Sequence, residues 1–365
     1  MKSADPSITR ITTAVYRFPT PEPEADGTLQ WDATTAVTVT LQAGDKFGLG
    51  WTYSAGAAAR VVDDVLATAI EGRSAHDIAG GWAAMHRTSR NLGTKGLVMQ
   101  ALSAVDIAWW DLKARLLDVS LADLFGGCCR EIPVYGSGGF TTLTESELEK
   151  QVDWWRSAGC TAMKIKIGEA NGGSIARDLE RVRQLAKFAG DDVELMVDAN
   201  GGYTVGQARR VGAALDDSSV TWFEEPVSSD NTSGLAQLRG CLRLDIAAGE
   251  YAADVYDMRA LLPAVDCLQL DATRCGGYTG WLRGAALAQS WDLPVSAHCA
   301  PSLHAPVAAA IPNLRHVEWF VDHARLEPLL VDGSPTVRDG ALQLEREQPG
   351  HGMRISRQAG EWRIA

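Results

Sequence analysis

The sequence predicts an α/β protein, a TIM-like (β/α) barrel preceded by an N-terminal α+β capping domain. From Ile132 to about Phe320, short apolar runs bounded by Gly, Pro or Asn alternate with segments of helical periodicity, as in parallel strands joined by helices. Eight such runs can be counted, and eight strands close a barrel. Several runs end in a charged side chain, at the end of the strand where barrels carry their sites. Their last residues are Tyr135, Lys166, Asp198, Glu224, Ala248, Leu270, Ala297 and Trp319.

The first part of the chain has a different pattern. Alternation of apolar and polar residues predicts three strands, and a turn at residues 44–46 joins the second to the third. Helical periodicity follows from Ala57 to Glu71 and from Leu97 to Leu117. Strands followed by helices indicate a separate α+β domain, which we place at residues 1–126. The predicted strands are Ile8–Phe18, Thr34–Leu41 and Phe47–Tyr53, and a loop rich in Pro and Glu is expected from Pro19 to Trp31.

The barrel is predicted over residues 127–328, with helices such as Ile175–Phe188 and Gln207–Leu215 between its strands. The last segment, residues 329–365, returns to short alternating stretches and Gly-rich turns. We expect this segment to pack back on the capping domain, since it does not continue the strand and helix pattern of the barrel.

The composition excludes some classes of partner. The chain has 365 residues and a net charge of −12, and an acidic protein lacks the basic footprint that binding to nucleic acid needs. No apolar stretch is long enough for a membrane span, and the first residues lack the apolar core of a signal peptide. The seven cysteines include no Cys-x-x-Cys pair, which favours reduced thiols and a cytoplasmic location. Cys128 and Cys129 are adjacent, whereas Cys160, Cys267, Cys275 and Cys299 lie in or beside apolar runs, where we expect them to be buried.

Three carboxylates recur at equal spacing in the middle of the chain. Asp198, Glu224 and Glu250 follow three successive strands at intervals of 26 residues, one βα unit of a barrel. Neighbouring strand ends would bring these side chains together, where they repel one another unless a cation lies among them. Ligation by oxygen alone favours a hard divalent ion, so the predicted cofactor is Mg²⁺. The alternative is that each acid caps the start of a helix, which is common for a single carboxylate.

Two lysines lie on one face of a predicted strand. In the run Lys164-Ile165-Lys166, the alternation of side chains puts both ammonium groups on the same side. On an exposed face such a pair would only increase solubility. Inside a barrel, each ammonium and the metal would lower the pKa of the other lysine, so that one could act as a base near neutral pH. We assign the base to Lys166, which is nearer the rim, and substrate positioning to Lys164.

A second polar set ends the later strands. Asp271 and His298 each follow directly on an apolar strand, and the two strands are neighbours. An aspartate fixes the tautomer of such a histidine and raises its pKa, which suits a general acid or base. Glu318, on the last strand, could donate a proton to a developing oxyanion or hydrogen-bond the substrate if it faces inward. No spacing argument supports a role for His304 or His323, which we expect to be structural.

Together these groups define a reaction class. A divalent ion would bind a substrate carboxylate and stabilise the ene-diolate that forms when a base removes the α-proton. Lys166 and His298 lie on opposite sides of the metal cluster in strand order. Proton abstraction on one face and proton return on the other then become possible, and the predicted partner is a small-molecule carboxylate.

These motifs together resemble those of the enolase superfamily and, within it, the mandelate racemase subgroup. The resemblance covers most of the chain, with a capping domain, a modified barrel and a C-terminal segment that rejoins the cap. A Lys or His base used together with Mg²⁺ is a known pattern of that superfamily. The matching residues are Lys164-Ile165-Lys166, Asp198-Ala199-Asn200, Glu224-Glu225-Pro226, Gly249-Glu250, Asp271 followed by Gly276-Gly277, and His298.

The resemblance implies a role for each position. The three carboxylates would be the Mg²⁺ ligands, Lys166 one base, the His298–Asp271 pair the other, and Glu318 an assisting carboxylic acid. One departure is informative. The muconate-cycloisomerase and dipeptide-epimerase branch has a second Lys at the end of the sixth strand, whereas this chain has Asp271-Ala272-Thr273-Arg274 there. That branch is therefore disfavoured.

The same resemblance points to substrate contacts and to assembly. The Pro19–Trp31 loop matches the family's specificity loop in position, and Trp31 would either close over the substrate or pack on the cap. Asn200 is a further candidate substrate contact. Relatives usually assemble through cap and barrel surfaces, so we expect a homo-oligomer.

Two enzyme activities fit this site. The first is dehydration of an acid sugar to a 2-keto-3-deoxy acid, which the resemblance favours because it is common among relatives with the His–Asp pair. The second is racemisation or epimerisation of a 2-hydroxy or related acid, which two bases allow equally. Two more distant alternatives are a non-catalytic barrel that binds carboxylates and an aldolase that forms a Schiff base at Lys164 or Lys166.

Overall fold

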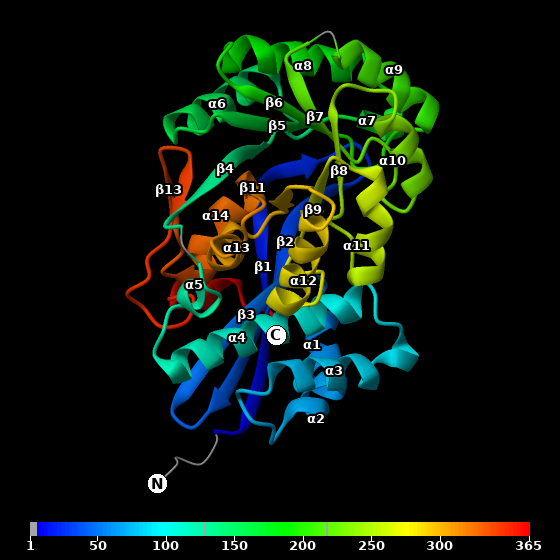
Figure 1. Ribbon diagram of the computed structural model, residues 1–365. Helices are drawn as coiled ribbons and strands as arrows, with labels where there is room; N and C mark the ends of the chain where they lie inside the picture. The colour runs from blue at the N-terminus through cyan, green and yellow to red at the C-terminus, as the bar shows by residue number, and fades with distance from the viewer. Residues whose placement is uncertain (1–5, 128, 217) are drawn as a thin grey trace.

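The protein has two parts, one above the other in Figure 1. This computed structural model describes residues 6–127, 129–216 and 218–365. The blue and cyan part is an α+β domain built from the start of the chain, and the green to orange part is the barrel. The fold class predicted from the sequence is confirmed.

The capping domain is built on an antiparallel sheet in the order β1-β2-β3. Helix Leu97–Leu117 is found with its predicted bounds, whereas the predicted helix Ala57–Glu71 is divided by a π-helical turn. The strands are β1 (Arg10–Ala25), β2 (Gln30–Ala43) and β3 (Lys46–Tyr53). The helices are α1 (Ala57–Val61), η1 (Val62–Leu66), α2 (Ala67–Ile70), α3 (Ile78–Thr88), η2 (Arg90–Leu92), α4 (Leu97–Leu117) and α5 (Leu121–Leu124).

The prediction of a loop from Pro19 to Trp31 is wrong. Strand β1 continues to Ala25, β2 begins at Gln30, and Glu24 pairs with Trp31, so the segment is a hairpin. Strand β1 lies at the edge of its sheet, and an edge strand tolerates proline because the missing N–H would face away from the ladder. The pairing is irregular between residues 19 and 24, where the prolines lie. A composition typical of loops therefore concealed an edge strand.

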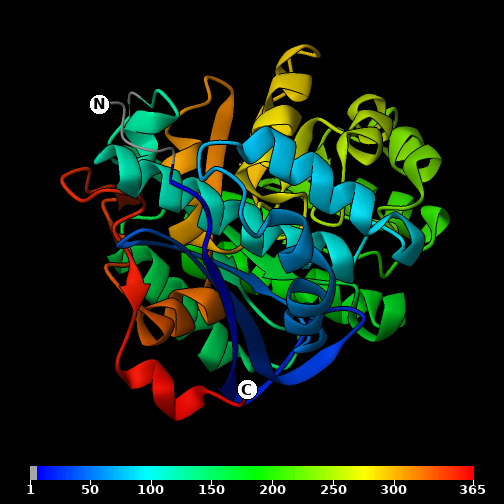
Figure 2. The same ribbon diagram turned by 90° about the horizontal axis from the view of Figure 1, so that it is seen from below.

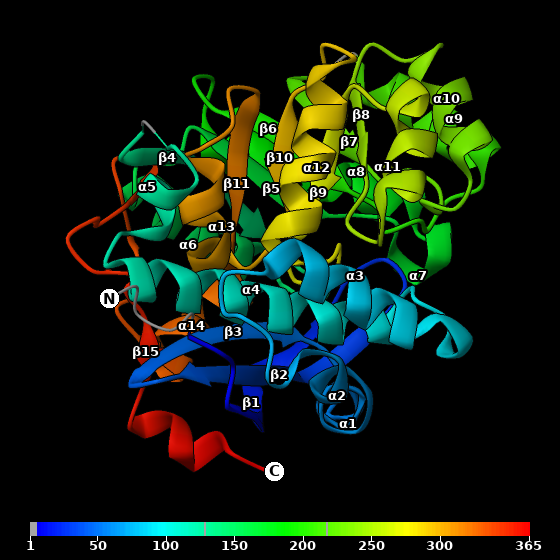
Figure 3. The same ribbon diagram turned by 60° about the horizontal axis from the view of Figure 1, so that its bottom comes forward.

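The tip of this hairpin reaches the mouth of the barrel, beside α7 (Glu169–Gly172) in Figure 3. The amide of Asn171 donates to the carbonyl of Gly27 at 2.9 Å, and the amide of Thr141 donates to the carbonyl of Ala25 at 2.8 Å. A Cβ atom at Gly27 would lie 2.6 Å from the carbonyl oxygen of Ile167. Only glycine allows this close approach of the two backbones, which holds the cap against the barrel at that point.

Eight parallel strands close into the barrel because β11 pairs with β4. Six of the predicted strand ends coincide with those of the structure, while the first strand continues to Gly138 and the last to Phe320. The strands are β4 (Glu131–Gly138), β5 (Ala162–Lys166), β6 (Glu194–Asp198), β7 (Val220–Glu224), β8 (Asp245–Ala248), β9 (Cys267–Leu270), β10 (Val295–Ala297) and β11 (Leu314–Phe320).

Helices surround the barrel, and α4 lies between the cap sheet and the barrel (Figure 3). Two buried aspartates of α4 fix this position. Asp106 accepts a hydrogen bond from the hydroxyl of Thr279 at 2.7 Å, and Asp111 accepts one from the amide of Leu49 at 2.8 Å. The helices of the barrel are α6 (Glu145–Ser157), α8 (Ile175–Ala189), α9 (Val205–Leu215), α10 (Thr232–Arg239), α11 (Val255–Leu261), η3 (Leu262–Ala264), α12 (Gly277–Gln289), α13 (Pro301–Ala308) and α14 (Val321–Leu330).

The C-terminal segment contacts both parts of the molecule. Strand β14 (Ala341–Gln343) pairs antiparallel with β4 of the barrel. The final residues lie along β1 of the cap, where the amide of Val15 donates to the carbonyl of Ala365 at 2.9 Å, and Figure 2 shows this red end beside the blue strand. The other elements of this segment are β12 (Val331–Asp332), β13 (Thr336–Arg338), β15 (Arg354–Ile355) and η4 (Gln358–Trp362).

Four cysteines are buried with free thiols, as the apolar runs around them predict: Cys160, Cys267, Cys275 and Cys299. Cys129 and Cys241 are exposed, and Cys128 lies outside the described residues. Within the part of the chain that the structure describes, no helix combines the length and the apolar character needed to cross a membrane.

Candidate functional site

Three buried carboxylates meet at the C-terminal ends of neighbouring barrel strands. Asp198 ends β6, Glu224 ends β7, and Glu250 follows β8 after Gly249. One carboxylate oxygen of each residue lies within 4.8 Å of the others. Gly249 has a φ of 135°, and a Cβ atom there would lie 2.3 Å from the carbonyl oxygen of Gln269. The turn that brings Glu250 to the other two acids therefore requires glycine.

The donor set of this cluster fits a hard divalent cation. Oε1 of Glu224 and Oε2 of Glu250 are buried and have no hydrogen-bond partner among the described residues. Burial and the nearby charge of Asp198 raise the pKa of Glu224 to about 8, which shows how unfavourable a second bare carboxylate is here. Carboxylate oxygens without partners are the ligands that Mg²⁺ takes in proteins. A cation at this point would satisfy atoms that the protein leaves unpaired.

Both lysines of β5 face this cluster, as the alternation of side chains predicts. Nζ of Lys166 lies 2.5 Å from Oδ2 of Asp198. Nζ of Lys164 lies deeper, 2.6 Å from Oε2 of Glu224 and 2.9 Å from Oε1 of Glu318. Lys164 is fully buried between two carboxylates, whereas Lys166 is the lysine nearer the opening of the barrel.

The lysine pKa values differ from the prediction. Burial by itself lowers the pKa of Lys166, but the charges of Asp198, Glu318 and Glu224 together outweigh it and raise the pKa above its usual range. Burial likewise lowers the pKa of Lys164, and the charges of Glu224 and Glu318 raise it further than burial lowers it. Lys164 does lower the pKa of Lys166, as expected, but the net shift is upward because the acids approach both lysines closely.

The predicted His–Asp pair is present. Nδ1 of His298 lies 2.9 Å from Oδ2 of Asp271, and this contact leaves Nε2 directed toward the carboxylates. Nε2 lies 3.4 Å from Oε2 of Glu250. Burial lowers the pKa of His298, but the charge of Glu250 and the hydrogen bond with Asp271 give a net rise. A raised pKa favours the charged form, which can donate a proton from Nε2.

Glu318 faces inward as expected, but it accepts hydrogen bonds and does not donate one. Its Oε1 accepts from the hydroxyl of Ser137 at 2.6 Å and from Lys164, and its Oε2 accepts from the amide of Cys299 at 2.8 Å. Burial raises the pKa of Glu318, but Lys164 and the other donors lower it well below its usual range. The expectation of a protonated, donating Glu318 is therefore wrong for this arrangement, because the donors around it stabilise the carboxylate.

The two candidate substrate contacts lie on different elements. Asn200 follows β6 with a φ of 45°, and its buried Oδ1 has no partner among the described residues. Trp31 lies on the cap hairpin, where its Nε1 donates to Oε2 of Glu24 at 2.9 Å and its ring meets Phe140 at 5.5 Å between centroids. An open hollow of about 350 Å³ lies beside Trp31 between residues of the cap and of the barrel, and Arg274 and His323 also line it. Trp31 therefore packs on the hairpin at the edge of a space that could hold a small molecule.

Sequence reasoning gave no role to two charged residues of the site. Arg274 lies 3.1 Å from Oε1 of Glu250 and 3.4 Å from Oδ2 of Asp271, so it links the two acids. Its position three residues after Asp271 was the available signal. Glu225 is buried, has a φ of 36°, and its Oε1 lacks a partner among the described residues. The sequence shows two adjacent glutamates at 224–225, but side chains alternate along a strand, so it assigns only one of them to the barrel interior.

His304 and His323, for which a structural role was expected, each accept a hydrogen bond from the backbone. Nε2 of His304 accepts from the amide of Ala272, and Nδ1 of His323 accepts from the amide of Ala300, each at 2.9 Å. These contacts support the backbone that carries the His–Asp pair.

Comparison with known families decides the relationship. Residues 8–126 match the model for the mandelate racemase / muconate lactonizing enzyme N-terminal domain, and residues 147–359 match the enolase C-terminal domain-like model. The chain belongs to the mandelate racemase / muconate lactonizing enzyme family of the enolase superfamily. The two matches cover the cap and nearly all of the barrel, so membership concerns the whole architecture.

Members of this family with similar sequences act on acid sugars by name. The 3,6-anhydro-α-L-galactonate cycloisomerase of Streptomyces coelicolor is 33% identical over 95% of this chain and 96% of its own length. The L-talarate/galactarate dehydratase of Salmonella typhimurium is 31% identical over 86% of this chain and 79% of its own. These relatives are a cycloisomerase and a dehydratase, in agreement with the predicted choice between lyase and isomerase.

Solved structures of the family superimpose closely. A mandelate racemase/muconate lactonizing enzyme-like protein from Rubrobacter xylanophilus has a TM-score of 0.95 and 42% identity, covering 98% of this chain and 100% of that one. The Salmonella dehydratase, liganded with Mg and L-lyxarohydroxamate, has a TM-score of 0.91 and 26% identity, covering 99% of this chain and 94% of that one. The metal in that structure agrees with the cofactor predicted from the sequence.

Proposed function

We propose that the chain catalyses Mg²⁺-dependent dehydration of an acid sugar to a 2-keto-3-deoxy acid. The observation that carries the proposal is the placement of Lys166 and the His298–Asp271 pair around one cluster of buried carboxylates. That arrangement provides one group to take a proton and another to give one. The names of the relatives support the same substrate class, since the Salmonella relative is an acid-sugar dehydratase.

Asp198, Glu224 and Glu250 would hold the metal, because two of them present buried oxygens without partners and all three converge. When bound, Mg²⁺ supplies positive charge that binds the substrate carboxylate and stabilises the negative charge that develops there as the α-proton leaves. Lys164 lies between Glu224 and Glu318 and would orient both carboxylates.

The proton transfers would fall to side chains on opposite sides of the cluster. A cation held by Asp198 would offset the charge that raises the pKa of Lys166, so that Lys166 could be neutral. Neutral Lys166 takes the proton from the α-carbon, and the electron pair of that bond forms a double bond to the β-carbon. The bond from the β-carbon to its hydroxyl breaks as Nε2 of His298 donates a proton, and the hydroxyl leaves as water. The resulting enol tautomerises to the keto acid. Asp271 would hold Nδ1 of His298 so that Nε2 faces the substrate.

A second candidate is ring opening of an anhydro sugar acid or a sugar lactone. It is favoured by the relative with 33% identity, which is a cycloisomerase. Only the leaving group differs, because the oxygen that departs from the β-carbon is then part of a ring and stays in the molecule. Racemisation or epimerisation, the third possibility, breaks no bond to oxygen and returns the proton to the opposite face of the α-carbon.

A screen in D₂O against stereoisomeric aldonic and aldaric acids and their lactones would separate these reactions. Dehydration gives a keto acid that lacks the mass of one water, and ring opening gives a keto acid of unchanged elemental composition. Epimerisation gives deuterium at the α-carbon with inversion and no keto acid. Lys166→Ala and His298→Asn should each abolish turnover, and EDTA should do so reversibly.

Two outcomes would contradict the proposal. Turnover that persists in EDTA, with a lysine trapped by borohydride and a carbonyl substrate, would indicate a Schiff-base aldolase. Mg²⁺-dependent binding of acid sugars that Lys166→Ala leaves intact, with no turnover by the wild type, would indicate a binding protein. Lys187→Met, at an exposed ion pair with Glu145, is a control that should leave every activity unchanged.

A further inference from the structure

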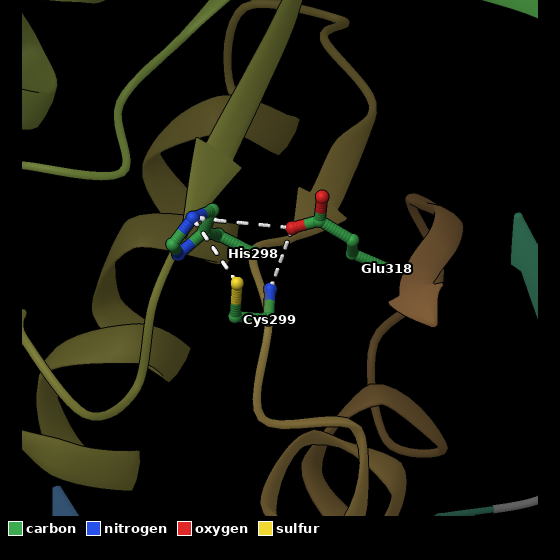
Figure 4. A group of neighbouring side chains, drawn as sticks. All are labelled: His298, Cys299 and Glu318. Atoms are coloured by element: carbon green, nitrogen blue, oxygen red, sulfur yellow. Dashed lines mark hydrogen bonds and ion pairs between the residues drawn. The ribbon is translucent and has the colours of Figure 1, made fainter. Parts of the chain in front are cut away.

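A second group of metal-ligand side chains lies next to the carboxylate cluster and has no part in the proposed reaction as a group. It consists of His298, Cys299 and Glu318, whose donor atoms all lie within 4.8 Å of one another. Figure 4 shows the imidazole, the thiol and the carboxylate directed toward one another from the ends of β10 and β11. All three side chains are buried.

The spacing of these donors suits one tetrahedral ion. Zinc binds sulfur at ~2.3 Å, nitrogen at ~2.0 Å and oxygen at ~2.1 Å, so two donors at the tetrahedral angle lie about 3.3–3.6 Å apart. Sγ of Cys299 lies 3.3 Å from Nε2 of His298, and Oε2 of Glu318 lies 3.9 Å from the same nitrogen. Only a small shift of the Glu318 carboxylate would bring the set to that geometry.

The donor atoms can present electron pairs to an ion. Nδ1 of His298 is held by Asp271, so Nε2 presents its lone pair once it has released its proton. Oε2 of Glu318 accepts one hydrogen bond, from the Cys299 amide, and a carboxylate oxygen can accept a second partner.

The backbone holds the thiol in this position. Cys299 and the next residue, Ala300, have φ values of 51° and 40°, which non-glycine residues seldom adopt. The Cys299 amide donates to Glu318, and the Ala300 amide donates to His323 at 2.9 Å. These two hydrogen bonds stabilise the unusual backbone conformation, which turns the thiol toward His298 and Glu318. Such a conformation at a buried position is typical of functional sites.

We propose that His298, Cys299 and Glu318 form an inhibitory site for a thiophilic divalent ion such as Zn²⁺, with solvent as the fourth ligand. Nitrogen and sulfur donors favour Zn²⁺, whereas the all-oxygen cluster beside them favours Mg²⁺. On binding, the thiol of Cys299 releases its proton to solvent and its sulfur would bond to the metal. Nε2 of His298 likewise releases its proton to solvent and would bind the metal through its lone pair, so Nε2 could no longer donate a proton, while Nδ1 keeps its own toward Asp271. The inhibitory effect rests on the proposed function, whereas the binding site itself does not.

Cobalt(II) is the probe for binding, because it replaces zinc and its bond to a thiolate gives a charge-transfer band in the near ultraviolet. The full-length protein, saturated with Mg²⁺, is titrated with Co²⁺. The wild type should show this band at one equivalent of Co²⁺ with the strong visible absorption of a tetrahedral ion. Added Zn²⁺ should displace Co²⁺ and so remove both the charge-transfer band and the visible absorption. Cys299→Ser and Cys299→Ala should lack the band. Cys267→Ser, which changes another buried thiol at the first residue of β9, should keep it.

Inhibition is measured separately, with any substrate that the screen finds. Zn²⁺ should inhibit the Mg²⁺-saturated wild type, and Cys299→Ser should weaken that inhibition by at least about tenfold, the smallest loss expected when even a supporting group of a zinc site is removed. A wild type without the cobalt band, or a band of equal strength in both Cys299 variants, would overturn the site. A site with the band but equal zinc inhibition in Cys299→Ser would overturn the inhibitory role. Absence of any turnover bears on the proposed function and leaves the cobalt result standing.

Discussion

Lys164 offers the sharpest test of how the site is held together. Its ammonium is fully buried, 2.6 Å from Glu224 and 2.9 Å from Glu318. We predict that Lys164→Met, which keeps most of the side-chain volume and removes the charge, destabilises the protein strongly. Two buried carboxylates would then lose their shared partner.

The magnitude follows from these distances. With an effective dielectric constant of about 20, each contact has an attraction of about 6 kcal/mol. Much of this offsets the cost of removing the ions from water, so the loss on breaking a buried pair is about 3–5 kcal/mol. At ~2 °C per kcal/mol for a large chain, the melting temperature should fall by about 6–10 °C. The matched control is Lys187→Met, whose partner Glu145 is exposed; a surface pair should change stability by less than about 1 kcal/mol.

The pH dependence identifies the cause. In the wild type, Lys164 and the other donors hold the pKa of Glu318 well below its usual range. Such a carboxylate adds stability above its unfolded pKa and loses it as the pH falls through its folded pKa. In Lys164→Met the carboxylates lack the cation, their pKa values rise, and the loss of stability should be largest at neutral pH and shrink in acid. Thermal unfolding from about pH 5 to about pH 8 measures this. A variant as stable as the wild type, or one whose deficit grows in acid, would refute the reasoning.

Three further predictions concern the surroundings of the site. Asp271→Asn should lower kcat by about 100-fold or more and shift the pH profile of kcat/KM, because His298 loses the carboxylate that holds its tautomer; an unchanged profile would argue against the pair. Gly249→Ala should weaken Mg²⁺ binding in calorimetry, because a Cβ atom 2.3 Å from a carbonyl oxygen displaces the turn before Glu250; unchanged affinity would count against that turn. Burial and the charge of Asp322 raise the pKa of Glu24 to about 8, so the folded protein favours the protonated carboxyl. The free energy of unfolding therefore falls as the pH rises from the pKa of Glu24 in the unfolded chain toward 8. Glu24→Gln should therefore melt higher than the wild type at about pH 9 and similarly at about pH 5; equal melting temperatures at both would contradict it.

The barrel was predictable because its signals are local and repeat. A strand buried on both faces has a short apolar sequence, and a side chain at its end has a fixed direction. Asp198 and Glu224 could thus be placed from their own strands alone. Glu250 needed the extra turn at Gly249, and the equal spacing of the three acids along the chain was the signal for it.

The errors have a common cause. The sequence shows which charges are present, but protonation depends on contacts between residues far apart in the chain. Glu318 was considered as a proton donor without its contact with Lys164, which lies 2.9 Å away and stabilises the carboxylate. The prediction of a loop at Pro19–Trp31 failed for a related reason. Proline shows that a residue cannot donate a backbone hydrogen bond, but the sequence does not show whether the segment lies at a sheet edge, where that donor is not needed.

The balance of charge at the barrel mouth locates the missing cation. Some acids of the site are matched by a cation of the chain or by several donors, as Asp198 is by Lys166 and Glu318 is by Lys164. The buried oxygens without partners are instead Oε1 of Glu224, Oε1 of Glu225 and Oε2 of Glu250. Burial together with Glu250, Asp198 and Glu224 raises the pKa of Glu225 well above its usual range. The oxygens without hydrogen-bond partners thus belong to Glu224, Glu225 and Glu250, and a divalent ion placed among them would compensate this charge while leaving Lys166 and the imidazole to exchange protons with a bound acid.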